Sequence, residues 1–100
     1  MQSENVSEDI KHLTYIFVTI MIEKFGDNIK IPTKFVDVYI EACKVPSNSN
    51  SKYDKSNLQL RQSVRDNLLR NGYIFVDPKD VDCIFLTQKA IQEYADYWGD

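Results

Sequence analysis

The sequence predicts a single α+β domain in which three helices are followed by a β-hairpin and a closing helix. Apolar side chains recur every three or four residues, the spacing of one helix face, over residues 8–25, 34–44 and 57–71. Residues 73–86 are rich in β-branched and aromatic side chains and are interrupted by the turn sequence DPKD. One hundred residues, 43% of them apolar, can form one hydrophobic core, so we expect residues 1–100 to be one domain.

The first predicted helix begins after Ser7 and ends before Gly26, and we expect residues 1–6 to be frayed. Ser7 is a suitable N-cap, and Gly26 is a suitable stop. Its apolar side chains occupy nearly two faces, one with Ile10, Leu13, Ile16, Phe17, Ile20 and Met21 and another with Tyr15, Val18, Ile22 and Phe25. A surface helix of a small domain normally has one apolar stripe. We therefore expect the second face to be covered by a partner.

A short strand and a second helix come next. Ile29–Ile31 is predicted to be a short extended segment that ends at Pro32. Thr33 is a suitable N-cap for a helix over residues 34–44. Residues 46–57, PSNSNSKYDKSN, form a polar loop that cannot bury apolar surface.

The third helix is predicted to begin at Ser56 or Asn57 and to run to about Asn71. Both side chains can cap a helix, and Gly72 can adopt the backbone conformation that ends one. One face carries an apolar row spaced four residues apart: Leu60, Val64 and Leu68.

The last third of the chain changes from helical to extended patterning. Tyr73–Val76 and Val81–Leu86 are predicted strands, joined by the turn at Asp77–Asp80. Thr87 then caps a closing helix whose apolar side chains fall on one face: Ile91, Tyr94, Ala95 and Trp98. The predicted order is helix, short strand, helix, helix, strand, turn, strand, helix.

This order resembles the winged helix-turn-helix superfamily, in which a hairpin called the wing follows the third helix directly. Residues 58–98, LQLRQSVRDNLLRNGYIFVDPKDVDCIFLTQKAIQEYADYW, look like the recognition helix, wing and last helix of many bacterial, archaeal and phage regulators. The resemblance covers residues 10–98 and implies DNA binding by the third helix. Two departures are the loop of about a dozen residues before that helix and Ala90, where many relatives have Gly.

The charge distribution places any DNA contact on the third helix. The chain carries a net charge of −3 and has a pI near 5.1, so bulk charge does not favour nucleic acid. Residues 52–71, however, hold five basic side chains against two acidic ones. The family's docking mode implies base contacts from Asn57, Gln59, Gln62 and Ser63, phosphate contacts from Lys52, Lys55 and Arg70, and snorkelling positions for Arg61 and Arg65. The alternative is a solvated helix face.

The predicted hairpin tip argues against a standard DNA complex. Asp77, Asp80 and Asp82 surround a single cation, Lys79. Three carboxylates would repel a phosphate backbone. We therefore expect the tip to face solvent or a protein.

Surplus aromatic and apolar side chains on the first and last helices predict a homodimer, because Tyr and Trp are common at interface centres. The predicted interface consists of Tyr15, Val18, Ile22, Tyr94, Tyr97 and Trp98. The alternative is that Tyr94 and Trp98 simply cover the core of their own chain.

The residues that usually carry chemistry are sparse. Cys43 and Cys83 are predicted to be reduced, buried thiols, since a structural zinc site needs about four ligands and His12 is the only histidine. We expect His12 to be exposed. Without a nucleophile motif, a phosphate loop or a metal cluster, we predict no catalytic residue, no cofactor and no enzyme activity.

The first dozen residues are polar and acidic, which is not the pattern of a signal peptide. The most apolar run, residues 13–22, is half the length that spans a bilayer. We therefore expect a cytoplasmic protein with no membrane partner.

Two functions remain open from the sequence. The first is a dimeric winged-helix protein that binds double-stranded DNA and regulates transcription or a mobile element. The second is a winged-helix interaction module, an adaptor or inhibitor that docks through its acidic wing and does not bind DNA. Duplex binding that weakens with salt and depends on Arg61, Arg65 and Lys55 distinguishes the first from the second.

Overall fold

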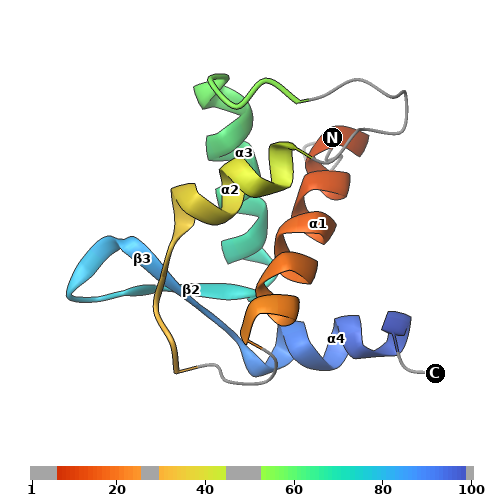
Figure 1. Cartoon of the computed structure of the whole chain (residues 1–100), viewed down its shortest axis with the longest axis vertical. Helices are drawn as coiled ribbons and strands as arrows, with labels where there is room; N and C mark the ends of the chain where they lie inside the picture. Colours follow the sequence, from red (N-terminus) through yellow and green to blue (C-terminus); the bar gives the residue numbers. More distant parts are fainter. Residues whose placement is uncertain (1–6, 26–29, 45–52, 99–100) are drawn as a thin grey trace.

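The computed structural model describes residues 7–25, 30–44 and 53–98, with only the backbone described for residue 25 and residues 95–98. Within these ranges the chain is an α+β fold of four helices and a three-stranded antiparallel sheet. The elements, in order, are α1 (Glu8–Phe25), β1 (Thr33–Lys34), α2 (Phe35–Cys43), α3 (Leu58–Arg70), β2 (Ile74–Asp77), β3 (Asp80–Leu86) and α4 (Gln88–Trp98) (Figure 1). The order of helices and strands predicted from the sequence is confirmed.

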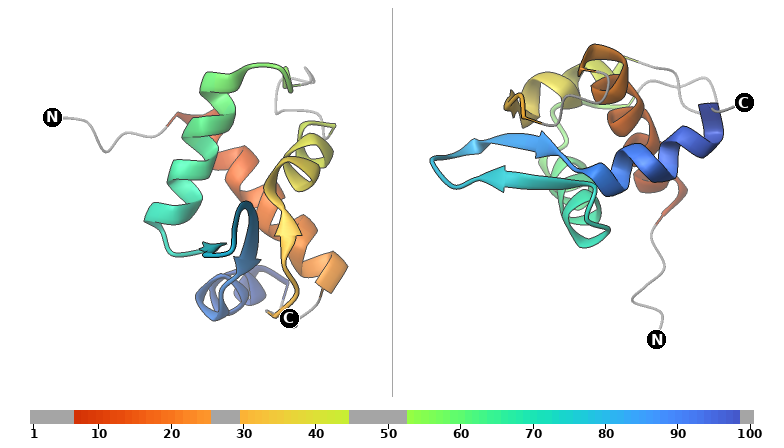
Figure 2. Two further views of the ribbon diagram at one scale, coloured as in Figure 1. Left: turned by 90° about the vertical axis from the view of Figure 1, so that its left-hand side faces the viewer. Right: turned by 90° about the horizontal axis from the view of Figure 1, so that it is seen from below.

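The first helix is the centre of the packing. α1 contacts α2, α3 and α4, and the β-hairpin contacts α2 and α3. The hairpin and α4 extend in opposite directions from the base of the fold (Figure 1 and the right view of Figure 2). This arrangement points the tip of the hairpin away from the C-terminal end of α4.

The sheet has the strand order β1–β3–β2. Ile74 pairs with Leu86 and Val76 with Ile84, so these side chains share the face of the hairpin that contributes to the core. Phe75 pairs with Phe85 on the opposite face. A register shift follows Val76, and the hairpin closes through the pair Asp77 and Asp80.

The core is formed by side chains from every helix and from β2 and β3. The rings of Phe17, Phe35 and Tyr39 stack in sequence, with centroid distances of 5.0 and 5.9 Å. Among the described residues, the fully buried side chains are Leu13, Phe17, Val18, Met21, Val38, Tyr39, Ala42, Val64, Leu68, Ile84 and Ala90.

A short polar network links α1 to α3 inside the fold. The Thr14 hydroxyl donates to the Ile10 carbonyl at 2.7 Å and accepts from the Asn67 amide at 2.9 Å. The Asn71 amide donates to the carbonyl oxygen and the side-chain oxygen of Asn67, at 2.8 and 3.1 Å. These bonds satisfy buried polar groups that would otherwise destabilise the helix pair.

The predicted helix ends are confirmed at four positions. The Ser7 hydroxyl accepts from the amide of Ile10, the Asn57 side chain from that of Leu60 and the Thr87 hydroxyl from that of Ala90, so each is an N-cap. Gly72 follows α3 with a φ of +73°, the left-handed conformation in which glycine is favoured.

The predicted start of the second helix is wrong. Thr33 does not cap α2 but lies in β1, where it pairs with Ile84 of β3. The N-cap is Lys34, and no side chain caps this end. The predicted strand at residues 29–31 is also misplaced: Ile29 lies outside the described residues, and Ile31 precedes β1. Pairing with a distant strand, rather than local composition, decides where this strand forms.

Candidate functional site

The exposed face of α3 carries three of the polar side chains that the sequence singled out, Gln59, Gln62 and Arg70. Val64, Asn67 and Leu68 are buried, so their side of the helix faces the core. Because successive residues are rotated by about 100°, the opposite side faces solvent. That side consists of Leu58, Gln59, Gln62, Asp66, Leu69 and Arg70, all exposed.

One edge of α3 borders a hollow of about 450 Å³. We call this hollow the notch. Its lining residues come from the β1–α2 junction, from α3 and from β3 of the hairpin. The left view of Figure 2 shows the hairpin between α3 on one side and β1 and α2 on the other. The lining residues are Lys34, Phe35 and Val36 at the start of α2, Arg61, Gln62 and Arg65 on α3, and Val81 and Asp82 on β3.

Arg65 connects the walls of the notch. Its Nη2 atom donates to the carbonyl oxygen of Val81 at 3.2 Å. Its guanidinium carbon lies 5.3 Å from the ring centroid of Phe35, within the range of a cation–π interaction. Arg65 therefore fixes the hairpin relative to α2 and α3.

The notch carries more positive than negative charge. Lys34, Arg61 and Arg65 line it against a single carboxylate, Asp82. Among the described residues, none of these three cations forms a salt bridge. The positive charge in the notch is thus not neutralised by a neighbouring side chain in contact with it.

The structure divides the predicted DNA-binding residues into groups. Arg61, Gln62 and Arg65 come together at the notch. Helical geometry places Gln59, Ser63 and Arg70 along the other edge of α3. The Asn57 side chain is occupied as the N-cap, Lys55 lies exposed before α3, and Lys52 lies outside the described residues.

Lys34 is a functional candidate that sequence reasoning missed. In the sequence it was one more polar residue at the start of the second helix, and only its pairing with Cys83 of β3 brings it beside α3. No local signal points to this placement, because the two strands are far apart in the chain.

The carboxylates of the hairpin tip hold the turn itself. The Asp77 carboxylate accepts from the Lys79 amide at 2.9 Å, and that of Asp80 accepts from the Asp82 amide at 3.0 Å. Two of the three aspartates therefore have a structural role in this turn.

The outer face of the hairpin exposes an aromatic pair. Phe75 and Phe85 stack with ring centroids 5.0 Å apart, and Phe75 is 49% exposed. Val81, near the tip, is 67% exposed. Successive side chains of a strand point to opposite faces, so Phe75 and Phe85 lie on the face opposite the buried Ile84.

The prediction that α1 has a second exposed apolar face is wrong. Val18 is fully buried and Tyr94 is 8% exposed, so both belong to the core of their own chain. Tyr15 and Ile22 are half-buried against that core, and the Tyr94 ring packs on those of Tyr15 and Tyr73. α2, α3 and α4 together cover α1, which explains its wide apolar surface. The side chains of Tyr97 and Trp98 lie outside the described residues.

His12 is not exposed as predicted but is partly buried against the end of the polar loop. Its Nδ1 atom lies 2.8 Å from the hydroxyl of Tyr53, in hydrogen-bonding contact. After Tyr53, both the amide and the hydroxyl of Ser56 donate to Asp54 and lower the pKa of that carboxyl. Of the predicted loop at 46–57, residues 46–52 lie outside the described residues.

Both cysteines are free thiols, with Cys43 buried and Cys83 half-buried. Burial raises the pKa of each thiol, and at Cys83 the neighbouring Asp80 carboxylate raises it further. Neither thiol has the lowered pKa that marks a reactive cysteine. Among the described residues, no three His, Cys, Asp or Glu side chains lie close enough together to hold a metal ion.

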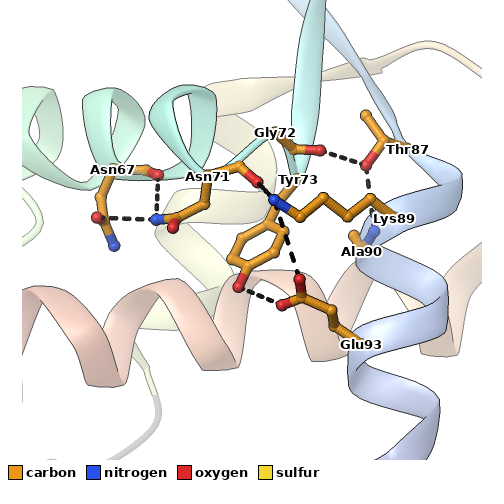
Figure 3. Close-up of polar contacts among 8 residues, drawn as sticks. All are labelled: Asn67, Asn71, Gly72, Tyr73, Thr87, Lys89, Ala90 and Glu93. Carbon is orange, nitrogen blue, oxygen red and sulfur yellow. Dashed lines mark hydrogen bonds and ion pairs between the residues drawn. The ribbon is translucent and has the colours of Figure 1, made fainter.

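The base of the hairpin is tied to α4 by the polar contacts in Figure 3. The Thr87 hydroxyl donates to the Gly72 carbonyl at 2.6 Å, and Lys89 donates to the Asn71 carbonyl at 2.6 Å. The Tyr73 hydroxyl donates to Glu93 at 2.7 Å. Burial and this acceptor raise the pKa of Tyr73. The hairpin thus has a fixed base and a second attachment, through Arg65, near its tip.

Comparison with known proteins found no matching family model, no matching curated protein and no matching solved structure. None of the helices in the described ranges is long and apolar enough to cross a membrane. The site must therefore be interpreted from its own geometry and charge.

Proposed function

We propose that this chain is a winged helix-turn-helix domain that binds double-stranded DNA, with α3 as the recognition helix and the β2–β3 hairpin as the wing. The proposal is supported by the order of elements and by an antiparallel hairpin that begins directly after α3. In this fold the helix before the wing enters the major groove.

The observation that carries the proposal is the group of cations beside α3. Lys34, Arg61 and Arg65 come from different parts of the chain and line one concave surface. Most affinity of proteins for DNA comes from cations that neutralise phosphates. A local group of this kind supplies that attraction to a chain whose net charge is negative.

In the proposed complex the polar side chains of α3 have different roles. Gln59, Gln62 and Ser63 face the bases, whose edges amides and hydroxyls can read. Lys55 and Arg70 approach the phosphates. We further propose that the protein acts as a homodimeric, cytoplasmic regulator of transcription or of a mobile element, with the contact at the C-terminal part of α4, including Tyr97 and Trp98.

Fluorescence anisotropy with a labelled random duplex tests this proposal. Four phosphate contacts give a slope of about −3.6 in log K against log salt, which is about a 150-fold loss of affinity between 50 and 200 mM salt. Arg61→Gln should make the slope shallower by about 0.9. The matched control is Lys11→Gln, because Lys11 is an exposed cation on α1 whose partner is Glu8. Absence of duplex binding at 50 mM salt would contradict the proposal.

The exposed aromatic pair on the hairpin favours a second candidate function, docking to another protein. Phe75 and Val81 are apolar, exposed and close to an acidic tip, a combination suited to a partner with an apolar, basic surface. In this case the protein does not bind duplex, and Phe75→Ser removes a partner that the unmodified protein retains on a column. In the DNA-binding case, Phe75→Ser leaves duplex affinity unchanged.

A further inference from the structure

We propose that the notch is a seat for a single phosphate group. The inference rests on the proposed function only for the source of that phosphate, which is a DNA backbone in the first instance. A free phosphate ester offers the same chemistry, and the experiment below separates the two sources.

The shape of the notch suits a phosphate with its neighbouring sugar. About 450 Å³ lies within the range of sites that hold small ligands. Phe35, Val36 and Val81 supply apolar wall, and Phe35 is almost fully buried.

The donors in the notch fit an anion that has several acceptor oxygens. Arg61 and Arg65 present planar guanidinium groups, which bind phosphate through paired hydrogen bonds. Lys34 adds a third cation, and Gln62, whose side-chain amide donates to the Asp66 carboxylate at 3.4 Å, adds polar wall. Because the Val81 carbonyl and the Phe35 ring already orient Arg65, this side chain loses little further freedom when an anion binds.

Asp82 is the opposing charge in this site. Three cations against its one carboxylate leave a net of two positive charges in the notch, which matches an anion better than a cation or a neutral group. The other acidic residue near this end of α2 is Asp37, which lines a different hollow together with Lys24 and Glu41.

The first turn of α2 adds to the attraction. Lys34 is its N-cap, with an extended backbone and no side chain bonded to the amides that follow. Uncapped amides at a helix N-terminus favour negative charge. Phe35 and Val36, the first residues of this helix, are part of the notch wall.

Two measurements test the inference on the intact chain. The first is a titration with inorganic phosphate at constant ionic strength, followed by the backbone amide signals of Val36 and Arg65 in NMR. The second is duplex affinity by anisotropy. The variants are Lys34→Gln, Arg61→Gln and Asp82→Asn. Arg70→Gln is the matched control for the phosphate titration, because Arg70 lies on the other edge of α3, and Lys11→Gln is the control for duplex affinity. Circular dichroism verifies that each variant is folded.

We expect saturable signal changes with phosphate that Lys34→Gln and Arg61→Gln abolish and Arg70→Gln leaves in place. Each loss of a phosphate contact should weaken duplex binding about eightfold at 0.1 M salt. Asp82→Asn should strengthen phosphate binding about two- to fivefold, because it removes a repulsive charge and keeps the shape.

The remaining outcomes separate the two hypotheses. Saturable phosphate binding at the notch without duplex binding supports the notch as a phosphate site and contradicts the proposed DNA function. The phosphate would then come from a free phosphate ester. Duplex binding that Lys34→Gln weakens no more than Lys11→Gln, together with no saturation by phosphate, overturns the seat and leaves DNA binding standing. Failure of both phosphate and duplex to bind overturns both.

Discussion

Replacing Tyr39 by Phe should make the protein more stable. Tyr39 lies in α2 and is fully buried, and its hydroxyl has no hydrogen-bond partner among the described residues. Its ring stacks on that of Phe35. The substitution Tyr39→Phe removes the oxygen and retains the ring, so it isolates the contribution of an unpaired hydroxyl.

The size of the effect follows from the desolvation of that hydroxyl. Burying a polar group without a partner costs about 1–3 kcal/mol in proteins. The small void left by one oxygen offsets part of the gain. We therefore expect the free energy of unfolding to rise by about 1 kcal/mol, which corresponds to a Tm increase of about 4–8 °C for a domain of this size.

Urea unfolding followed by far-UV circular dichroism measures this change. With an m-value of about 1–3 kcal/mol/M, the midpoint should rise by about 0.3–1 M at unchanged m. The matched control is Tyr73→Phe. The Tyr73 hydroxyl donates to the Glu93 carboxylate, so this variant should instead lose about 0.5–1.5 kcal/mol.

A lower midpoint for Tyr39→Phe would refute the reasoning. It would mean that the hydroxyl is paired in solution, and the Cys43 thiol, which together with burial raises the pKa of Tyr39, would be the partner. In that case Cys43→Ala should produce a similar loss of stability, and the effects of the two substitutions should not add.

Further predictions concern a turn, the brace of the hairpin and alkaline pH. Gly72→Ala should lower the free energy of unfolding, measured in urea, by about 1–2 kcal/mol, because φ at this position is +73°. An added Cβ would meet only the Lys89 side chain, at 3.6 Å, so the cost arises in the backbone. Unchanged stability would contradict this backbone conformation. Arg65→Met keeps an apolar side chain against Phe35 but loses the hydrogen bond to the hairpin. We expect the free energy of unfolding to fall by about 0.5–1.5 kcal/mol and amide hydrogen exchange in β3 to become faster. Unchanged exchange would show that Arg65 does not brace the hairpin. Burial raises the pKa of the Cys43 thiol, so the folded state holds this proton more tightly than the unfolded chain does. The contribution of the protonated thiol to stability is full below about pH 8. It declines as the pH rises through the pKa of the unfolded state and then through that of the folded state. Urea midpoints at neutral and alkaline pH, compared with those of Cys43→Ala, measure this contribution, and an alkaline gain in stability relative to that variant would contradict it.

The parts of the fold that the sequence predicted are those determined by neighbouring residues. Ser7, Asn57 and Thr87 cap helices by bonding to amides three residues later. Gly72 ends α3 through its own backbone conformation. The hairpin follows from the β-branched and aromatic composition and the turn sequence within residues 73–86. Each of these signals lies within one short window of the chain.

The parts that the sequence did not predict depend on residues far apart. Thr33 lies in a strand because Ile84 pairs with it, and Val18 is buried because three helices surround α1. The candidate site shows the same limit. The basic character of α3 was visible in the sequence, but the contribution of Lys34 and the contact between Arg65 and Val81 require the three-dimensional arrangement.

The pairing of β1 with β3 has a consequence for the order of folding. β2 and β3 are joined by a tight turn, whereas Thr33 and Ile84 are some fifty residues apart in the chain. Closing the longer loop costs more chain entropy, so the hairpin should form before β1 docks on it. That docking step also brings Lys34 to α3 and completes the notch. An anion in the notch would therefore bind only the fully assembled chain, and at 100 times its Kd it would add about 2.7 kcal/mol to the stability of the last part of the fold to form.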